Sequence, residues 1–345
     1  MSANEAILSM KGLYTSFFTH LGEVKALRGI DLQVNKKEVL GIVGESGSGK
    51  SVTALSVMRL LLHPGRVTAG EIFFKGEDLL KKSEHEMSHI RGNDIAMIFQ
   101  DPMTSLNPVL KVGFQIEEVL MKHQKLSKSE AAAKAVQMLE KVGIPDSARR
   151  ARCYPHEFSG GMRQRAMIAM ALSCEPSLLI ADEPTTALDV TIQAQIIRLI
   201  RELGSDTGAS TILITHDLGV VADICDRIAV MYAGLIMEEG SAEDIFFNPS
   251  HPYTMGLLKS IPKADAGVRE RLIPIPGTPP DLLNPPKGCP FSPRCSFAMN
   301  ICNSCQPGYY AISEGHRATC WLLDERAPKN EGYCSMKGGV GANGK

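Results

Sequence analysis

The stretch GIVGESGSGKSVTAL, residues 41–55, places four glycines before a lysine at the point where a helix is expected to begin. Gly44, Gly49, Lys50 and Ser51 fit the pattern G-x-x-x-x-G-K-[ST], with an apolar run before it and a helical pattern after it. Without Cβ atoms, successive backbone N–H groups can form a concave anion site at a helix N-terminus. The stretch predicts a phosphate-binding loop (P-loop) for a nucleotide, with Lys50 at the β- and γ-phosphates and the Ser51 hydroxyl on Mg2+.

A pair of carboxylates follows a second apolar run, SLLIADEP at residues 177–184. Asp182 ends the predicted strand, and Glu183 follows at its C-terminal mouth, where open α/β sheets bind ligands. Two adjacent carboxylates in this position can have different roles, one in metal binding and one in proton transfer. We expect Asp182 to hold Mg2+ through water and Glu183 to accept a proton from the attacking water.

A second anion site is predicted at FSGGMRQR, residues 158–165. Ser159, Gly160 and Gly161 open another helix, so a hydroxyl, bare backbone N–H groups and a positive helix end converge. This site has no lysine of its own. We interpret it as a cap for the nucleotide pocket of another molecule.

Four apolar runs bounded by polar residues predict buried strands of a parallel sheet, at 38–44, 95–99, 177–182 and 210–215. Helical patterns alternate with them, which indicates a layered α/β core. Ser127 and Glu130 predict a capped helix start, and a second helix is expected to end at Gly204. Residues 101–173 are mostly helical in pattern and predict an insertion.

The composition of the chain limits the classes of protein to which it can belong. The chain has 345 residues, of which 44% are hydrophobic, and 37 basic against 38 acidic residues. This balance provides no domain-wide basic field for nucleic acid. The N-terminus lacks a secretory pattern, and no uncharged apolar run reaches the length of a membrane span, so we expect a soluble chain.

The composition changes after about residue 260, where proline and glycine dominate IPIPGTPPDLLNPPKGCPFSPRC, residues 273–295. Such a segment favours an extended or looped tail. Its cysteines are spaced C-x5-C-x6-C-x17-C, with Cys305 and Cys334 in addition; the four are Cys289, Cys295, Cys302 and Cys320. A disulfide framework is not expected without a secretory signal. Zinc, with His316 as a possible ligand, and an iron–sulfur cluster both remain open.

The ordered motifs resemble those of ABC-type ATPases over roughly residues 5–240. The resemblance lies in the P-loop, Gln100 of IFQDP, FSGG, LLIADEP, Asp189 of ALD and His216 of LITHD. Met162 departs from the glutamine usual at that position. The implied fold is a RecA-like α/β core with an antiparallel β subdomain and a helical insertion over residues 1–260. A Pro/Cys-rich extension follows over 261–345.

The resemblance also implies a head-to-tail dimer with two ATP molecules between its subunits. Glu183 and His216 would be catalytic, and Mg2+ would be held through Ser51, Gln100 and Asp182. Across the dimer, signature contacts would come from Ser159, Gly160, Gly161, Arg163 and Gln164, with Asp189 in the D-loop. In its own subunit, ATP would contact Phe17, Gly44, Ser46, Gly47, Ser48, Gly49, Lys50, Ser51, Val52 and Gln100.

The tail strings HPYTMGLLKSIP, IPGTPPDLL and GCPFSPRCSFAMNIC resemble the extension of the oligopeptide/dipeptide/nickel branch of ABC importers. That branch implies a [4Fe-4S] cluster held by Cys289, Cys295, Cys302 and Cys320, with Cys305 able to substitute.

The expected function is the ATP-hydrolysing subunit of a di-/oligopeptide importer, peripheral on the cytoplasmic face of the inner membrane. Its expected partners are a second, related ATPase chain in a heterodimer, two transmembrane permease subunits and an extracytoplasmic peptide-binding protein, with no nucleic acid. A nickel-chelate importer is the alternative. A soluble ABC ATPase acting on ribosomes or DNA is disfavoured by the single motif set and the near-neutral charge.

Overall fold

The structure is a computed structural model that describes residues 5–101, 105–186, 189–260 and 274–333. The described chain forms two compact units, each built from segments that are distant in sequence. The first unit holds residues 5–8, 34–39 and the described parts of 73–214; the second holds Ser9–Gln33, Leu40–Ile72 and the described parts of 215–333. The predicted domain boundary after residue 260 stays a prediction.

The first unit contains three parallel strands that the apolar runs predicted. β7 (Leu178–Asp182) lies between β6 (Ile95–Ile98) and β8 (Ser210–Thr215), and both pairings are parallel. Every residue of the three strands is buried, which explains why their sequences lack the alternation of a half-exposed strand. The register pairs Asp182 with Ile214, so β7 delivers its terminal carboxylate at the C-terminal end of the sheet.

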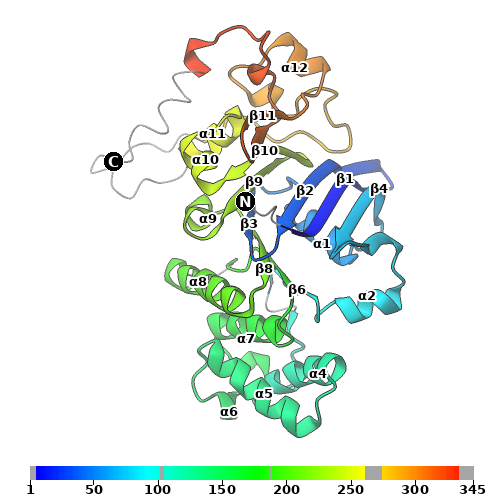
Figure 1. The fold of residues 1–345 in the computed structure, drawn as a ribbon, viewed down its shortest axis with the longest axis vertical. Helices are drawn as coiled ribbons and strands as arrows, with labels where there is room; N and C mark the ends of the chain where they lie inside the picture. The colour runs from blue at the N-terminus through cyan, green and yellow to red at the C-terminus, as the bar shows by residue number, and fades with distance from the viewer. Residues whose placement is uncertain (1–4, 102–104, 187–188, 261–273, 334–345) are drawn as a thin grey trace, which may run out of the picture. The chain divides into compact units, whose positions relative to one another are not determined.

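The described residues of 101–173, the segment with the predicted helical pattern, are mostly helical in this unit. α4, α5 and α7 pack against one another in the green part of Figure 1. The Ser127 capping box is present, because the Ser127 hydroxyl accepts from the Glu130 N–H and the Glu130 carboxylate accepts from the Ser127 N–H. The bounds are α2 (Glu84–Ile90), α4 (Val112–Gln124), α5 (Lys128–Lys141), α6 (Ser147–Arg150), α7 (Gly160–Leu172) and α8 (Val190–Thr207).

The predicted end of α8 at Gly204 is wrong. The helix continues to Thr207 and ends at Gly208, whose φ of 68° is the left-handed conformation of a helix C-cap. Gly204 instead allows close packing, since a Cβ there would lie 3.3 Å from the Thr211 hydroxyl.

The second unit combines parallel and antiparallel pairings. β3 (Val39–Val43) pairs in parallel with β9 (Arg227–Tyr232), and β9 pairs antiparallel with β10 (Leu235–Ser241). A further sheet has the order β2-β1-β4-β5; the pairing of β4 with β5 is antiparallel, and its residues, Phe73, Phe74, Glu77 and Asp78, belong to the first unit. The strands of this sheet are β1 (Ala6–Thr19), β2 (Gly22–Asn35), β4 (Gly65–Phe74) and β5 (Glu77–Asp78).

The described residues of the predicted looped segment, 274–295, contain no strand and only one short 3-10 helix (Ser292–Arg294), as expected, but two strands that were not predicted follow it. β10 pairs antiparallel with β12, and β12 pairs antiparallel with β11. These two strands could not be predicted from the sequence, because β11 and β12 are only four and three residues long and too short for a recognisable strand pattern. The bounds are α1 (Lys50–Met58), α9 (Leu218–Ile224), α10 (Ala242–Phe247), α11 (Pro252–Lys259), α12 (Asn300–Ser304), β11 (Tyr310–Ser313) and β12 (His316–Ala318). No helix in the described part of the chain is both long and apolar enough to cross a membrane.

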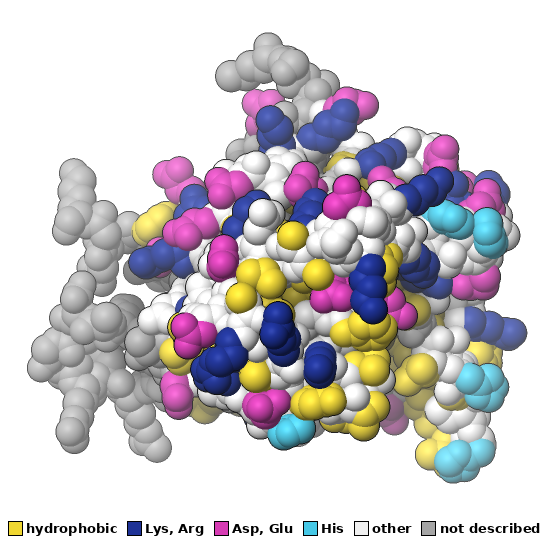
Figure 2. All heavy atoms as spheres, turned by 90° about the horizontal axis from the view of Figure 1, so that it is seen from below, with side chains coloured by type: hydrophobic (Ala, Val, Ile, Leu, Met, Phe, Trp, Pro, Cys, Tyr) yellow, Lys and Arg dark blue, Asp and Glu magenta, His cyan; other side chains and the backbone are white. Residues whose placement is uncertain are grey.

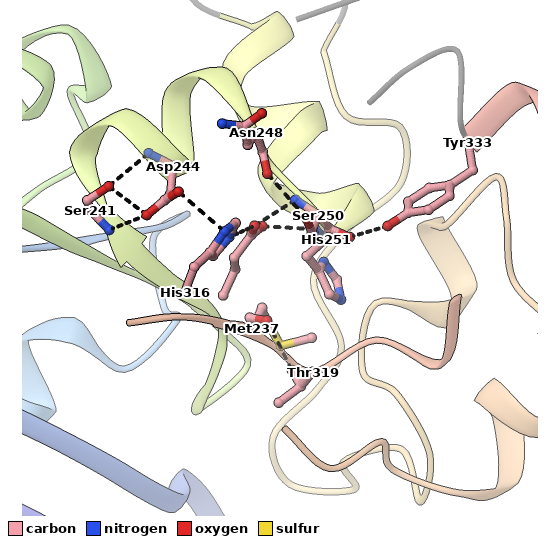
Figure 3. A network of polar contacts seen from close by, with 10 residues as sticks. Met237, Ser241, Asp244, Asn248, Ser250, His251, His316, Thr319 and Tyr333 are labelled. Atoms are coloured by element: carbon pink, nitrogen blue, oxygen red, sulfur yellow. Dashed lines mark hydrogen bonds and ion pairs between the residues drawn. The ribbon is translucent and has the colours of Figure 1, made fainter. Parts of the chain in front are cut away.

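A buried carboxylate fastens β12 and the start of α11 to β10. The Glu238 carboxylate accepts hydrogen bonds from the backbone N–H groups of Ser250 (2.6 Å) and His251 (2.9 Å), and it lies 2.8 Å from His316 Nε2. Figure 3 shows the surrounding network, in which the Tyr333 hydroxyl also donates to the Ser250 carbonyl. Burial lowers the pKa of His251 to about 3, so its neutral Nδ1 accepts from the Tyr253 N–H.

Replacing Glu238 by alanine is expected to lower the free energy of unfolding by about 3–5 kcal/mol. The change leaves two buried N–H groups and a buried imidazole without their acceptor. Urea denaturation of the full chain measures the effect. The control is Glu243→Ala, because Glu243 is an exposed glutamate on α10, for which we expect a change within about 0.5 kcal/mol. Equal effects in the two variants would contradict the assigned role.

Candidate functional site

The P-loop lies between β3 and α1, as the sequence predicted. Gly44 has a φ of 152°, and a Cβ at this position would lie 2.1 Å from the carbonyl oxygen of Met231 on β9. Gly49, at φ 107°, is the N-cap of α1, where a Cβ would lie 2.9 Å from a Leu27 methyl. Only glycine fits at these two positions without displacing neighbours.

Lys50 is held over the loop rather than extended into solvent. Its ammonium donates to the carbonyl oxygens of Gly44 (2.8 Å) and Glu45 (3.0 Å), and the residue is only 5% exposed. The first turn of α1 contains no acidic residue to compensate the positive helix end. A cation and uncompensated N–H dipoles therefore coincide at this end of the loop.

The other predicted loop residues differ in exposure. Ser46 and Gly47 are exposed, and a Cβ at Gly47 would meet no atom within 4 Å. Ser48 is buried, and its hydroxyl has no hydrogen-bond partner. Ser51 and Val52 are half-buried in the first turn of α1. An unused buried hydroxyl within an amide-rich loop fits an oxygen-rich anion such as triphosphate.

Glu183 is positioned directly beyond β7 by a strained backbone. Its φ of 44° lies in the left-handed region, which costs free energy for a residue with a Cβ. The Glu183 N–H donates to the Ile214 carbonyl at 2.9 Å and holds this conformation. The carboxylate accepts from Gln100 Nε2 at 2.9 Å and from the Thr186 hydroxyl at 3.1 Å. Two neutral donors thus orient a carboxylate that remains half-exposed.

The structure brings Gln100, Asp182 and Glu183 together within the first unit. Asp182 is the last residue of β7 and is 5% exposed, whereas Gln100 is exposed two residues after the end of β6. Neighbouring parallel strands place their C-terminal residues at one edge, which explains the contact between segments 83 residues apart. Thr186 was not predicted from the sequence, since no motif marks its contact with Glu183.

Two further predicted residues lie in the second unit. His216 is exposed and follows the last residue of β8. Phe17, on β1, is half-buried, and its ring would meet any Cβ added at Gly65 at 2.5 Å. The neighbouring Phe18 is 40% exposed, with the Arg66 guanidinium 4.3 Å from its ring centroid.

The signature residues stand at the N-terminus of α7, as predicted. Ser159 is the exposed N-cap and accepts from the Met162 N–H at 3.3 Å, while Gly160 and Gly161 form the first turn. This turn contains no acidic residue, so the positive end of the helix dipole is not compensated by a carboxylate of the turn and favours an anion.

The remaining predicted contacts differ in their access to solvent. Arg163 donates from Nε to the Phe158 carbonyl, and Gln164 is buried at 1% exposure. Asp189 is exposed at the N-cap position of α8, where its side chain makes no capping hydrogen bond. Asp189 can therefore reach a second molecule, whereas the Gln164 side chain points into its own unit.

The four predicted cysteines of the tail lie near one another. The Cys289 N–H donates to the Cys302 carbonyl at 2.8 Å. Burial raises the pKa of the Cys289 and Cys295 thiols to about 11. Burial, and then the nearby Cys289, Cys295 and Cys302, raise the pKa of Cys320 still further.

The predicted metal site of the tail is not supported by the structure. Within the described residues, no three His, Cys, Asp or Glu side chains form a group that could hold a metal ion. His316, the alternative zinc ligand, directs its ring nitrogens at Glu238 (2.8 Å) and Asp244 (3.7 Å). Cys305 is exposed, and Cys334 lies outside the described residues.

Comparison with protein families agrees with the fold and the P-loop. Residues 27–186 match the family described as ABC transporter, and residues 237–302 match the family described as oligopeptide/dipeptide transporter, C-terminal region. Among solved structures, a dimeric post-hydrolysis ATP-binding cassette, MJ0796 with ADP and Pi, is 27% identical with a TM-score of 0.62. The alignment covers 68% of this chain and 98% of that one. The fold and the loop define the class: an ABC-type ATPase.

Comparison with individual ABC-type ATPases shows to which family within this class the chain belongs. The chain is 56% identical to the oligopeptide transport ATP-binding protein OppD of Bacillus subtilis strain 168, over 94% of this chain and 91% of the relative. It is also 56% identical to the dipeptide transport ATP-binding protein DppD of the same strain, over 94% of this chain and 96% of the relative. The chain belongs to the family of oligopeptide and dipeptide transport ATP-binding proteins.

Proposed function

We propose that this chain is the ATP-hydrolysing subunit of an importer of dipeptides or oligopeptides. The observation that carries the substrate class is the 56% identity to OppD and DppD over nearly the whole chain. The proposed substrate class is also supported by the match of residues 237–302 to the family described as oligopeptide/dipeptide transporter, C-terminal region.

The proposed nucleotide site uses the P-loop for the triphosphate. Lys50, the unused Ser48 hydroxyl and the N–H groups of the first turn of α1 would contact the phosphates. Phe17 or a neighbouring aromatic side chain would stack on adenine. Further contacts are proposed for Gly44, Ser46, Gly47, Gly49, Ser51, Val52 and Gln100.

The proposed hydrolytic group is Glu183, which would accept the proton of the attacking water at its carboxylate. Its hydrogen bonds from Gln100 and Thr186 fix the orientation of that carboxylate. Mg2+ would be held by oxygen atoms of Ser51, Gln100 and Asp182, which are the ligand type this ion prefers. When bound, Mg2+ would neutralise charge on the phosphates. His216 would donate a hydrogen bond to the γ-phosphate.

The proposed active form is a head-to-tail dimer. The uncompensated N-terminus of α7, with Ser159, Gly160 and Gly161, would contact the nucleotide of a second ATPase subunit, as would Arg163. The predicted contact of Gln164 is not kept, because its side chain is buried. The exposed Asp189 would lie at the same interface. The dimeric state of the related cassette with ADP and Pi supports this arrangement.

An apolar surface on the first unit is proposed to contact the membrane subunits. Val109 is 74% exposed, Phe114 40% and Tyr154 36%. These residues are close together, because the N–H groups of Val112 and Gly113 at the start of α4 donate to carbonyls at 153 and 151. Exposed apolar patches of this kind mark interaction sites. Two permease subunits would bind there and place the chain at the cytoplasmic face of the cell membrane, with an extracytoplasmic peptide-binding protein supplying substrate.

Nucleic acid is not part of the proposed function. On the face of the molecule in Figure 2, basic and acidic side chains are interspersed rather than sorted into a basic track.

Proteoliposomes that contain this chain, its related ATPase chain and the two permease subunits test the proposal. With the peptide-binding protein outside and ATP inside, we expect radiolabelled peptide to accumulate. The matched control contains Glu183→Gln and should show no accumulation above background. Uptake of a nickel chelate but not of peptide would replace the proposed substrate, and ATP hydrolysis without uptake of either would contradict the importer function.

A further inference from the structure

The second residue of the P-loop is bound by an arginine 249 positions later in the chain. Arg294 Nη1 donates to one Glu45 carboxylate oxygen at 2.6 Å, and Nη2 donates to the other at 2.9 Å. This two-point geometry is the strongest form of an arginine–carboxylate pair. The Arg294 side chain is 4% exposed and that of Glu45 27%, so the pair is largely shielded from water.

The Arg294 guanidinium also donates to the proline-rich segment at residues 275–276 and to β9. Nε donates to the Pro276 carbonyl at 2.8 Å, Nη2 to the Ile275 carbonyl at 3.2 Å, and Nη1 to the Tyr232 hydroxyl at 3.1 Å. The guanidinium also lies 5.8 Å from the ring centroid of Phe291. Hydrogen bonding to Glu45 raises the pKa of Arg294, which stays charged. One side chain thus joins the proline-rich tail to the P-loop.

A second contact from the C-terminal half of the chain reaches the backbone of the same glutamate. The Glu45 N–H donates to the Tyr253 hydroxyl at 2.9 Å, from the first turn of α11. The Glu45 carbonyl accepts from the Lys50 ammonium at 3.0 Å. Side chain, N–H and carbonyl of Glu45 are therefore all fixed, and two of these three contacts come from residues beyond 250.

A carboxylate at this place is unfavourable for an anion site unless it is neutralised. Glu45 directly follows Gly44 in a loop whose N–H groups and lysine attract negative charge. An unpaired Glu45 would repel phosphates and compete for Lys50. Its pairing with Arg294 balances the charge of the carboxylate.

We propose that Arg294 is a positioning residue for the nucleotide. By fixing and neutralising Glu45 it keeps the P-loop in the form that binds triphosphate, so the C-terminal extension sets the affinity for ATP. This inference rests on the proposed assignment of the P-loop as the ATP site.

The test measures the Kd of the full chain for ATP by displacement of a fluorescent ATP analogue. Arg294→Ala should raise the Kd by about 10-fold, which corresponds to about 1.4 kcal/mol. Combining Arg294→Ala with Glu45→Gln should restore the Kd to within about 3-fold, because the repelling charge is then absent. In ATPase assays, Arg294→Ala should raise the KM and leave kcat within about 2-fold.

Arg317→Ala is the matched control. Arg317 is also a tail arginine, and it binds the Glu239 carboxylate through Nε (2.9 Å) and Nη2 (2.6 Å) and donates to the Asp31 carbonyl. Its loss should leave the Kd within about 2-fold. If Arg294→Ala does not fold, Arg294→Lys replaces it. A lysine keeps the charge but lacks the two-point geometry, so the Kd should rise by about 3-fold.

Three outcomes would overturn the inference. The first is an unchanged Kd for ATP in the Arg294 variants, and the second is an equal increase of the Kd in Arg317→Ala. The third is a Kd that stays raised when Glu45→Gln is added to Arg294→Ala, because Arg294 would then have only a structural role. Lys50→Ala separates this inference from the assignment on which it rests. An unchanged Kd in Lys50→Ala would refute the P-loop as the ATP site, whatever the Arg294 variants do.

Discussion

Replacing Glu183 by glutamine lowers the ATP hydrolysis rate of the full chain by about 10^2- to 10^4-fold, while ATP still binds with nearly unchanged affinity. Glutamine keeps the size of the side chain and can still accept from Gln100, but it cannot take up a proton at neutral pH. Phosphate release under single-turnover conditions measures the rate, and displacement of a fluorescent ATP analogue measures the affinity.

Thr186→Val is the control for this prediction. It removes a hydrogen bond to the same carboxylate oxygen and leaves the carboxylate itself in place. We expect a rate within about 10-fold of the parent chain, because one neutral hydrogen bond contributes about 1 kcal/mol. Turnover by Glu183→Gln at the parent rate would show that another group accepts the proton.

Replacing Lys50 by alanine weakens ATP binding by about 30-fold or more, since a shielded charge pair with phosphate is worth about 2 kcal/mol or more. In the structure, the ammonium is already directed at the loop by the carbonyls of Gly44 and Glu45, so little ordering is needed when phosphate binds. The Kd for ATP is again the measured quantity. Lys75→Ala removes a lysine that is 44% exposed and pairs with Asp94, and it should bind ATP like the parent chain. Equal affinities of the Lys50 and Lys75 variants would contradict the proposed phosphate contact.

The buried strands and the P-loop could be predicted from the sequence because their signals are local. β6, β7 and β8 are short apolar runs, and Gly44 and Gly49 are separated by a fixed spacing from Lys50. The backbone conformations that demand glycine there are properties of a few adjacent residues. Asp182 and Glu183 could be singled out for the same reason, since Asp182 ends a short apolar run and Glu183 follows it.

Contacts between distant segments could not be predicted in this way. Tyr253 and Arg294 stand in the tail strings that resemble the extension of the importer branch, yet nothing in those strings indicates that both residues reach Glu45. The Gln100–Glu183 contact was also missed, because it depends on which strands are neighbours. The cysteine spacing suggested a metal, but spacing along the chain does not determine whether the side chains form a ligand group, and none is present among the described residues.

The short hairpin of β11 and β12 also affects how this chain behaves among its own copies. Because β12 pairs with β10, a chain truncated before Tyr310 would leave the backbone N–H and C=O groups on one side of β10 open to a strand from a neighbouring molecule. In the intact chain the hairpin shields that side. The irregular register between Ala311 and Ser313 on β11 disturbs the outermost ladder and makes it a poor template for intermolecular association.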